Sequence, residues 1–242
     1  KKGFAYENNK HVYFEVKKFN DIAEKWWDET GDFKPLHQIN PLRLDYIKNK
    51  CGIKGLRILD VGCGGGLLSE AMSNLGAEVV AIDASENTIG VARSHGLKVN
   101  SNVNYIQTTI EELMDKGEHK DFDAVTCLEM LEHVPEPSQI VENCSNLLKE
   151  SGHVFFSTIN RNPRSYLFAV IGAEYILNLL PKGTHDYSKF IKPSELASWI
   201  RASNLSLENT VGLSYNPISD YYWLSKDVQV NYMMHTVKVS ND

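Results

Sequence analysis

Cysteine is scarce and acidic residues outnumber basic ones in this sequence of 242 residues. The four cysteines contain no Cys-x-x-Cys spacing, which argues against a disulfide framework or a zinc ribbon and favours a reducing compartment. The formal net charge is −6, whereas a protein that binds nucleic-acid phosphates normally carries the opposite sign. No apolar signal core lies in residues 1–10, and no repeat or long linker divides the chain. We therefore expect one domain over residues 1–242 and no nucleic-acid partner.

Short apolar runs alternate with helical patterns from residue 56 onward. We expect strands at 57–61, 78–82, 103–106, 122–127 and 153–157, with helices at 67–75, 86–95 and 138–148. This alternation predicts an α/β fold with a parallel sheet and right-handed crossovers. Ligands of such sheets bind beyond the carboxyl ends of the strands, here near Asp60, Asp83 and Cys127.

The flanking regions follow other patterns. Apolar residues at helical spacing predict an amphipathic helix within 14–33, which would lie on the main body, and a second helix at 41–50. Residues 205–239 are typical of strands separated by turns.

A glycine-rich loop follows the first strand of the expected sheet. Gly62, Gly64 and Gly66 stand at alternate positions, so the backbone can approach a ligand closely beside a helix N-terminus. A dinucleotide fingerprint would need glycine at Leu67, which disfavours a nicotinamide-dependent oxidoreductase. Asp60 suits a ligand with an ammonium group, and Asp83 can accept both hydroxyls of a ribose. The alternative is a tight turn with a helix cap.

An ammonium group and a ribose together describe S-adenosylmethionine (SAM). The loop and its two acids resemble the nucleotide site of class I SAM-dependent methyltransferases, and this resemblance spans residues 56–160. It implies a Rossmann-like fold with a seven-stranded, mostly parallel sheet.

Three candidate catalytic residues follow the fourth strand. Glu129, Glu132 and His133 stand at i, i+3 and i+4, so they would share one face if they began a helix. Two carboxylates and an imidazole could bind Mg²⁺, which prefers oxygen ligands, and a metal would lower the pKa of a bound catechol. Without metal, His133 or Glu129 could act as a general base. The alternative is two solvated helix acids and a helix-capping histidine.

Several longer stretches narrow the resemblance to one family. They are 19–27, 40–43, 131–135, 155–162, 181–186, 215–217 and 231–233. Together they resemble the ubiquinone-biosynthesis O-methyltransferases over nearly the whole chain. The resemblance implies methylation of phenolic oxygens on polyprenylated rings at two steps, the substrates being a 2-polyprenyl-6-hydroxyphenol and a 3-demethylubiquinol.

The resemblance also assigns residues and subdivisions. Cofactor contacts fall on Arg43, Gly62, Asp83 and Leu128, with Arg43 at the cofactor's carboxylate, and the eukaryotic relatives' metal ligands fall on Glu129, Glu132 and His133. It implies an N-terminal helical cover (1–55), a SAM-binding core (56–160), an insertion or lid (161–200) and C-terminal strands (201–242). The rival functions are a methyltransferase of a soluble small molecule and a non-catalytic SAM-binding scaffold.

A polyprenyl substrate resides in a bilayer, and the segment 165–180 could reach it. This segment is apolar but interrupted by Glu174 and Asn178, so it is too short and too polar to span a membrane. It could lie among lipid headgroups, where the local net charge of +3 over 161–192 favours an anionic surface. The alternative is a buried lid helix. We expect a cytoplasmic protein peripheral to the inner membrane, or one on the mitochondrial matrix side in a eukaryote, with other ubiquinone-biosynthesis proteins as further partners.

Overall fold

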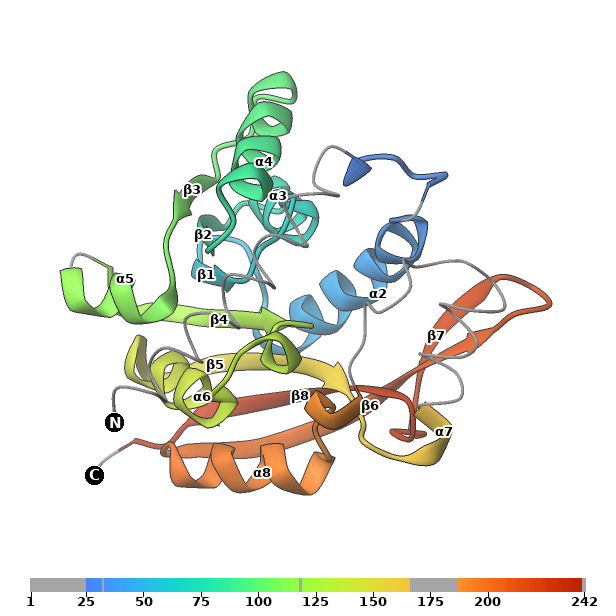
Figure 1. Ribbon diagram of the computed structural model, residues 1–242. Coiled ribbons are helices and arrows are strands. Elements are labelled where there is room, and N and C mark those ends of the chain that lie inside the picture. Colours follow the sequence, from blue (N-terminus) through green and yellow to red (C-terminus); the bar gives the residue numbers. More distant parts are fainter. Residues whose placement is uncertain (1–24, 32, 118, 166–186, 241–242) are drawn as a thin grey trace, which may run out of the picture.

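An eight-stranded mixed sheet forms the centre of the computed structural model, which describes residues 25–31, 33–117, 119–165 and 187–240. The strand order is β3-β2-β1-β4-β5-β8-β6-β7 (Figure 1). The first five strands run parallel: β1 (Arg57–Val61), β2 (Glu78–Asp83), β3 (Asn104–Gln107), β4 (Phe122–Leu128) and β5 (Leu148–Ile159). The other three are antiparallel: β6 (Leu205–Asn216), β7 (Tyr221–Ser225) and β8 (Asn231–Lys238).

Helices cover both faces of the sheet (Figure 1). On one face lie α2 (Lys34–Cys51), α3 (Leu67–Asn74) and α4 (Glu86–Lys98), and on the other α5 (Ile110–Lys116), α6 (Pro137–Asn146) and α8 (Pro193–Ala202). The central strands are apolar on both sides because each side packs on helices. In β1, for example, the fully buried Ile58 belongs to the core under α2–α4, and the fully buried Leu59 belongs to the core under α5, α6 and α8.

The sheet confirms the expected class of fold but has one strand more than the seven anticipated. The chain turns back after Asn216, and β7 pairs along the outer side of β6 from Gly212↔Ser225 to Asn216↔Tyr221. This hairpin is a local addition at the antiparallel edge, so it leaves the parallel half of the sheet and its crossovers unchanged.

The N-terminal helices differ from the expectation. Residues 25–31 form turns, so the helix expected within 14–33 does not extend through them, and residues 14–24 lie outside the described residues. The next helix, α2, begins at Lys34 rather than at Pro41, because Pro35 occupies its first turn, where proline is well tolerated. A further helix, α5, was not anticipated; a capping box between Thr109 and Glu112 begins it.

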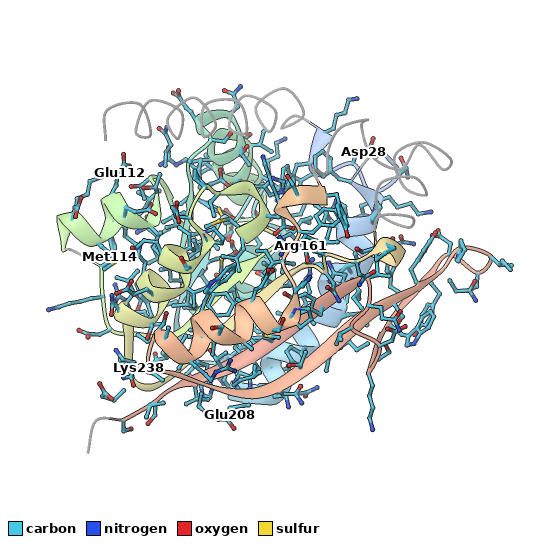
Figure 2. The ribbon with its side chains drawn as sticks, turned by 60° about the horizontal axis from the view of Figure 1, so that its bottom comes forward. Asp28, Glu112, Met114, Arg161, Glu208 and Lys238 are labelled. Carbon is cyan, nitrogen blue, oxygen red and sulfur yellow. The ribbon has the colours of Figure 1, made fainter. Side chains whose placement is uncertain are left out.

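The expected membrane-facing segment, 165–180, lies outside the described residues apart from Ser165. The chain enters it through the short helix α7 (Pro163–Ser165) and leaves it before the 3₁₀ turn Tyr187–Lys189. Just before α7, Arg161 (labelled in Figure 2) forms an ion pair with Glu195 of α8, which ties the end of β5 to that helix. Within the described ranges, no helix is long and apolar enough to cross a membrane.

Candidate active site

The glycine loop lies at the carboxyl end of β1 and is fastened to β2. Gly62, Gly64 and Gly66 all have positive φ angles, of 72°, 56° and 91°, which glycine adopts without steric cost. The backbone N–H groups of Gly62 and Cys63 both donate to the carbonyl oxygen of Ile82. The N–H of Gly64 donates to Asp83 Oδ2 at 3.0 Å. The structure thus brings Gly64 and Asp83 together, as a shared ligand site requires.

Asp83 ends β2 with its carboxylate held by backbone donors. Besides Gly64, the N–H of Ser85 donates to Asp83 Oδ1 at 2.9 Å. Burial raises the pKa of Asp83 above its ordinary value, although these two hydrogen bonds and the nearby His133 oppose the rise. Each carboxylate oxygen has further acceptor capacity, which a pair of ribose hydroxyls could use.

Asp60 points into the protein interior rather than outward. Its carboxylate accepts hydrogen bonds from Ser69 Oγ at 2.5 Å and Thr126 Oγ1 at 2.7 Å, and only 4% of the residue is exposed. Burial raises its pKa, against the effect of both hydrogen bonds. Asp60 therefore joins β1 to α3 and β4, and its part in cofactor binding would be exerted through the loop that follows it.

Two tryptophans from the turns before α2 pack against the glycine loop. A Cβ atom at Gly64 or Gly65 would overlap the ring of Trp26, so the loop must be glycine for this ring to fit. Trp27 donates from Nε1 to the carbonyl oxygen of Gly65 at 3.0 Å, and its ring stacks on His95 at 3.4 Å. Trp26 and Trp27 thus cover the glycine loop, and they lie in turns rather than in a helix.

Glu129 is the centre of a hydrogen-bond network at the end of β4. Its Oε1 accepts from Arg43 Nη2 at 2.7 Å and from Ser157 Oγ at 2.7 Å. Asn231 Nδ2 lies 3.1 Å from both carboxylate oxygens. Burial alone would raise the pKa of Glu129, but the Arg43 guanidinium and the hydrogen bonds from Ser157 and Asn231 outweigh it and lower the pKa. Glu129 is therefore ionised at neutral pH.

The backbone at Glu129 is strained. Its φ angle is +53°, in the left-handed region that residues other than glycine, asparagine and aspartate rarely adopt. The condition that Glu129, Glu132 and His133 begin a helix is therefore not met: the 3₁₀ turn Leu131–His133 follows, because the strained residue redirects the chain after β4. Strain of this kind persists where surrounding contacts fix the residue and is common at functional sites.

Glu132 is buried beside Glu129, but its pKa is shifted in the opposite direction. Only 4% of the residue is exposed, and Thr158 Oγ1 donates to its Oε2 at 2.8 Å. Burial and the neighbouring charge of Glu129 raise the pKa of Glu132 to about 7, and His133 opposes this rise. The two acids therefore divide into one ionised carboxylate and one that exchanges its proton near neutral pH.

The structure does not support the expected metal site at Glu129, Glu132 and His133. No group of three metal-ligating side chains suited to an ion occurs among the described residues. The donor set explains this: Arg43 already neutralises Glu129, whose oxygens accept four hydrogen-bond contacts, and Glu132 already accepts a hydrogen bond from Thr158. As arranged here, these side chains do not fit Mg²⁺.

Three residues of the site could not be identified from local sequence motifs. Ser157, Thr158 and Asn231 lie in stretches that carried the family resemblance, but nothing in their spacing marked them as partners of Glu129 and Glu132. They join the site because β5 pairs with β4 on one side and with β8 on the other, which places Ser157 beside Leu128 and Ile159 beside Asn231. Leu128, an expected cofactor contact, is half-buried at the end of β4.

Known proteins resemble this chain in sequence and in structure. A family model described as "Methyltransferase domain" matches residues 59–156. Ubiquinone biosynthesis O-methyltransferases from Hahella chejuensis and Dechloromonas aromatica are 55% and 57% identical to the chain, over 94% and 93% of it and 95% and 96% of their own lengths. A third, from Marinobacter nauticus, is 54% identical over 97% of this chain and 100% of its own.

Solved structures agree on the fold. Magnesium protoporphyrin IX methyltransferase from Synechocystis PCC 6803 with bound S-adenosylhomocysteine (SAH) is 18% identical with a TM-score of 0.67, over 93% of this chain and 96% of that one. A SAM-dependent methyltransferase from Thermotoga maritima is 19% identical with a TM-score of 0.65, over 94% and 99%.

The glycine loop, the sheet order and these matches define the class: a class I SAM-dependent methyltransferase. The three relatives share more than half of their residues with this chain over nearly their full lengths, which identifies the family within this class. The chain belongs to the family of ubiquinone biosynthesis O-methyltransferases.

Proposed function

We propose that this protein transfers the methyl group of SAM to a phenolic oxygen of a polyprenylated ubiquinone precursor whose ring carries two adjacent hydroxyls. The observation that carries the chemistry is the carboxylate pair at the end of β4, in which Glu129 is ionised and Glu132 has a pKa of about 7. A base acts most efficiently when its pKa lies near the working pH, which suits Glu132 to accept a phenolic proton. The names of the relatives support the substrate class.

Arg43 and Asp83 would hold the two ends of the cofactor. Arg43 Nε is buried and has no hydrogen-bond partner among the described residues, so the guanidinium retains a donor for the cofactor's carboxylate. Asp83 would accept the ribose hydroxyls, and Gly62 and Gly64 would admit the cofactor close to the backbone. Leu128 would offer apolar surface and backbone atoms beside it.

The residues of this chain would contribute a proton transfer and a fixed geometry. Ionised Glu132 takes the proton of the reacting hydroxyl, and Glu129, held by Arg43, Ser157 and Asn231, keeps a fixed negative charge beside it. The phenolic oxygen then attacks the methyl carbon as the carbon–sulfur bond breaks and SAH leaves. Holding the two reacting atoms in line supplies much of the rate enhancement.

Mg²⁺ could enter this site only after a rearrangement of its donors. Arg43 would have to leave Glu129, and Glu132 would have to lose its proton. Binding of the cofactor's carboxylate to Arg43 is one event that could release Glu129. Parallel assays with Mg²⁺ and with EDTA test this: activation by Mg²⁺ that is lost in E129Q indicates the rearrangement, and equal rates indicate that the observed pairing persists.

A methyl-transfer assay on a short-chain prenyl catechol tests the proposed function. We expect SAM-dependent formation of a mono-methyl ether and a higher rate in detergent or vesicles than in buffer alone. Transfer to a non-prenylated catechol without any effect of lipid would favour the soluble small-molecule enzyme. Binding of SAM without transfer to any catechol would favour the non-catalytic scaffold.

A further inference from the structure

A buried hydrogen-bond acceptor remains unused beside the carboxylate pair. Asn231 Oδ1 is shielded from solvent and has no hydrogen-bond partner among the described residues. Buried polar atoms in folded proteins nearly always have a partner, because an unsatisfied one loses its hydration without compensation. An unsatisfied acceptor in a side chain that contacts Glu129 therefore points to a donor that arrives with a ligand.

The orientation of the amide is determined by Glu129. Nδ2 lies 3.1 Å from both oxygens of an ionised carboxylate, so the NH₂ group must face Glu129. The reversed amide would place two acceptors against each other, which is repulsive. Oδ1 is consequently the atom that remains available.

The position of Asn231 is fixed by the sheet. Asn231 is the first residue of β8 and pairs with Ile159 of β5 on one side and Leu213 of β6 on the other. Figure 1 shows β8 between these two strands, in the antiparallel half of the sheet. Because the neighbouring strands hold the backbone of Asn231 on both sides, its side-chain acceptor has a fixed position, as a residue that recognises a ligand requires.

We propose that Asn231 recognises the second hydroxyl of the substrate ring: Oδ1 accepts a hydrogen bond from the hydroxyl next to the one that is methylated, while Nδ2 holds Glu129. This inference rests on the proposed function, which supplies a ring with adjacent hydroxyls. One hydroxyl gives its proton to Glu132, and its neighbour donates to Asn231. A ring with a single hydroxyl, or with a methoxy group in the second position, leaves Oδ1 without a donor.

This role makes Asn231 a determinant of specificity and limits the reaction to one methyl group. The mono-methyl ether could react again only with its methoxy oxygen facing Oδ1, where two acceptors would repel. We expect wild-type protein to prefer a prenyl catechol over its mono-methyl ether by about 10-fold or more, the discrimination that an unpaired buried polar group typically produces.

The test measures binding separately from activity. Calorimetry of the protein–SAH complex compares a short-chain prenyl catechol with the matching prenyl phenol in wild type, N231A and N231D. N231A should lose about 10-fold in affinity for the catechol and little for the phenol, both measured at saturating SAH. N231D keeps an acceptor but places a second acid against Glu129, so it should retain the preference for the catechol while its pH–rate profile moves to higher pH.

Asn143 of α6 provides the matched control. It is a buried asparagine whose Oδ1 accepts a hydrogen bond from Gln139 Nε2, and it belongs to the helix layer rather than to the site. N143A should leave the ratio of catechol to phenol affinity unchanged. Thermal unfolding checks each variant, and N231S replaces N231A if the latter does not fold, because a serine hydroxyl is too short to reach both partners.

The outcomes separate the two proposals. A catechol-to-phenol ratio in folded N231A or N231S equal to that of wild type overturns the role of Asn231. Failure of wild type itself to methylate any prenyl catechol overturns the proposed function, whatever the variants show.

Discussion

At the scale of single residues, the site combines two neighbouring acids that the fold treats differently. Glu129 receives a guanidinium, a hydroxyl and an amide, whereas Glu132 receives the Thr158 hydroxyl and a backbone hydrogen bond and is deeply buried. The same side-chain chemistry therefore yields a fixed charge at one position and a titrating group at the other. The left-handed backbone at Glu129 is part of this arrangement, since it turns the chain so that both carboxylates lie together.

Replacing Glu132 by glutamine should stabilise the protein while it removes the base. The folded-state pKa is about 7 and the unfolded one 4.5, so the folded state binds the extra proton between these values. Stability contributed by that proton is present below pH 4.5 and is lost as the pH rises through 7. We expect E132Q to exceed wild type in free energy of unfolding at pH 8 by about 3 kcal/mol.

Urea denaturation of both proteins at pH 4.5 and pH 8 measures this difference. It should be small at the lower pH, where glutamic acid and glutamine are both neutral, and T158A serves as a control that removes the hydrogen bond but keeps the acid. A difference independent of pH would mean that folding does not raise the pKa of Glu132 above its unfolded value.

Alanine substitutions at two glycines, one in the glycine loop and one in α4, should change stability in opposite directions. A Cβ at Gly62, where φ is +72°, would lie 2.7 Å from Met130 Cγ, so G62A should lower the free energy of unfolding by about 1–3 kcal/mol and weaken SAH binding. Gly90 lies inside α4 with no atom within 4 Å of its Cβ position. G90A should instead raise stability by about 0.5–1 kcal/mol. Thermal unfolding and calorimetry compare the two, and equal effects would contradict the assignment of the loop.

At the scale of elements, the sequence predicts the parallel half of the fold well. Short, mainly apolar runs flanked by turns specify β1, β2 and β4 almost to the residue, because each strand is buried on both faces. The conformation of residues 129–133 could not be predicted in the same way. Spacing at i, i+3 and i+4 does not reveal that Glu129 adopts a left-handed conformation, which is stabilised only by contacts from α2, β5 and β8.

The candidate site was likewise predictable only in part. Gly64 and Asp83 stand at the ends of strands that the sequence marks clearly, and the structure joins them. Ser157, Thr158 and Asn231 could not be assigned from spacing, because their places depend on the order β4-β5-β8, in which β5 and β8 are more than 70 residues apart in the sequence. Sheet order is a property of tertiary packing that a local pattern does not contain.

The pairing of β5 with β8 should make the protein sensitive to acid. His235 is buried on Phe155 and accepts or donates one hydrogen bond with His153 at 3.0 Å. Burial, with nearby His153 and Lys50, lowers the pKa of His235 to about 4, although Glu208 opposes this. Between pH 6.5 and pH 4, His235 is therefore protonated in the unfolded chain but neutral in the folded protein. The free energy of unfolding should consequently fall as the pH decreases through this range.

Unfolding of wild type and H235F across this pH range checks the effect. Phenylalanine keeps the stacking on Phe155 and removes the titrating ring, so the variant should lose less stability between pH 6.5 and pH 4 than wild type. Parallel curves for the two proteins would show that the acid sensitivity arises elsewhere.

At the scale of the whole molecule, the proposal requires the enzyme to obtain its substrate from a bilayer. The sequence between 161 and 192 carries a net charge of +3 in a chain of −6, and we propose that it binds an anionic membrane surface. Wild type should sediment with anionic vesicles, less so at high salt, and acidic substitutions at Leu167 and Ile171 should abolish sedimentation without lowering the thermal midpoint. Unchanged sedimentation of those variants would exclude this segment as the contact and favour a buried lid.

The pH dependence of kcat/KM for methyl transfer to a prenyl catechol, at saturating SAM, tests the central claim most directly. If Glu132 takes the phenolic proton, the rate should rise about tenfold per pH unit below pH 7 and level off above it, and E132Q should lose about 100-fold or more along with this limb. A wild-type profile that stays flat from pH 5 to 8, or an E132Q variant that keeps the same profile, would contradict the assignment of the base.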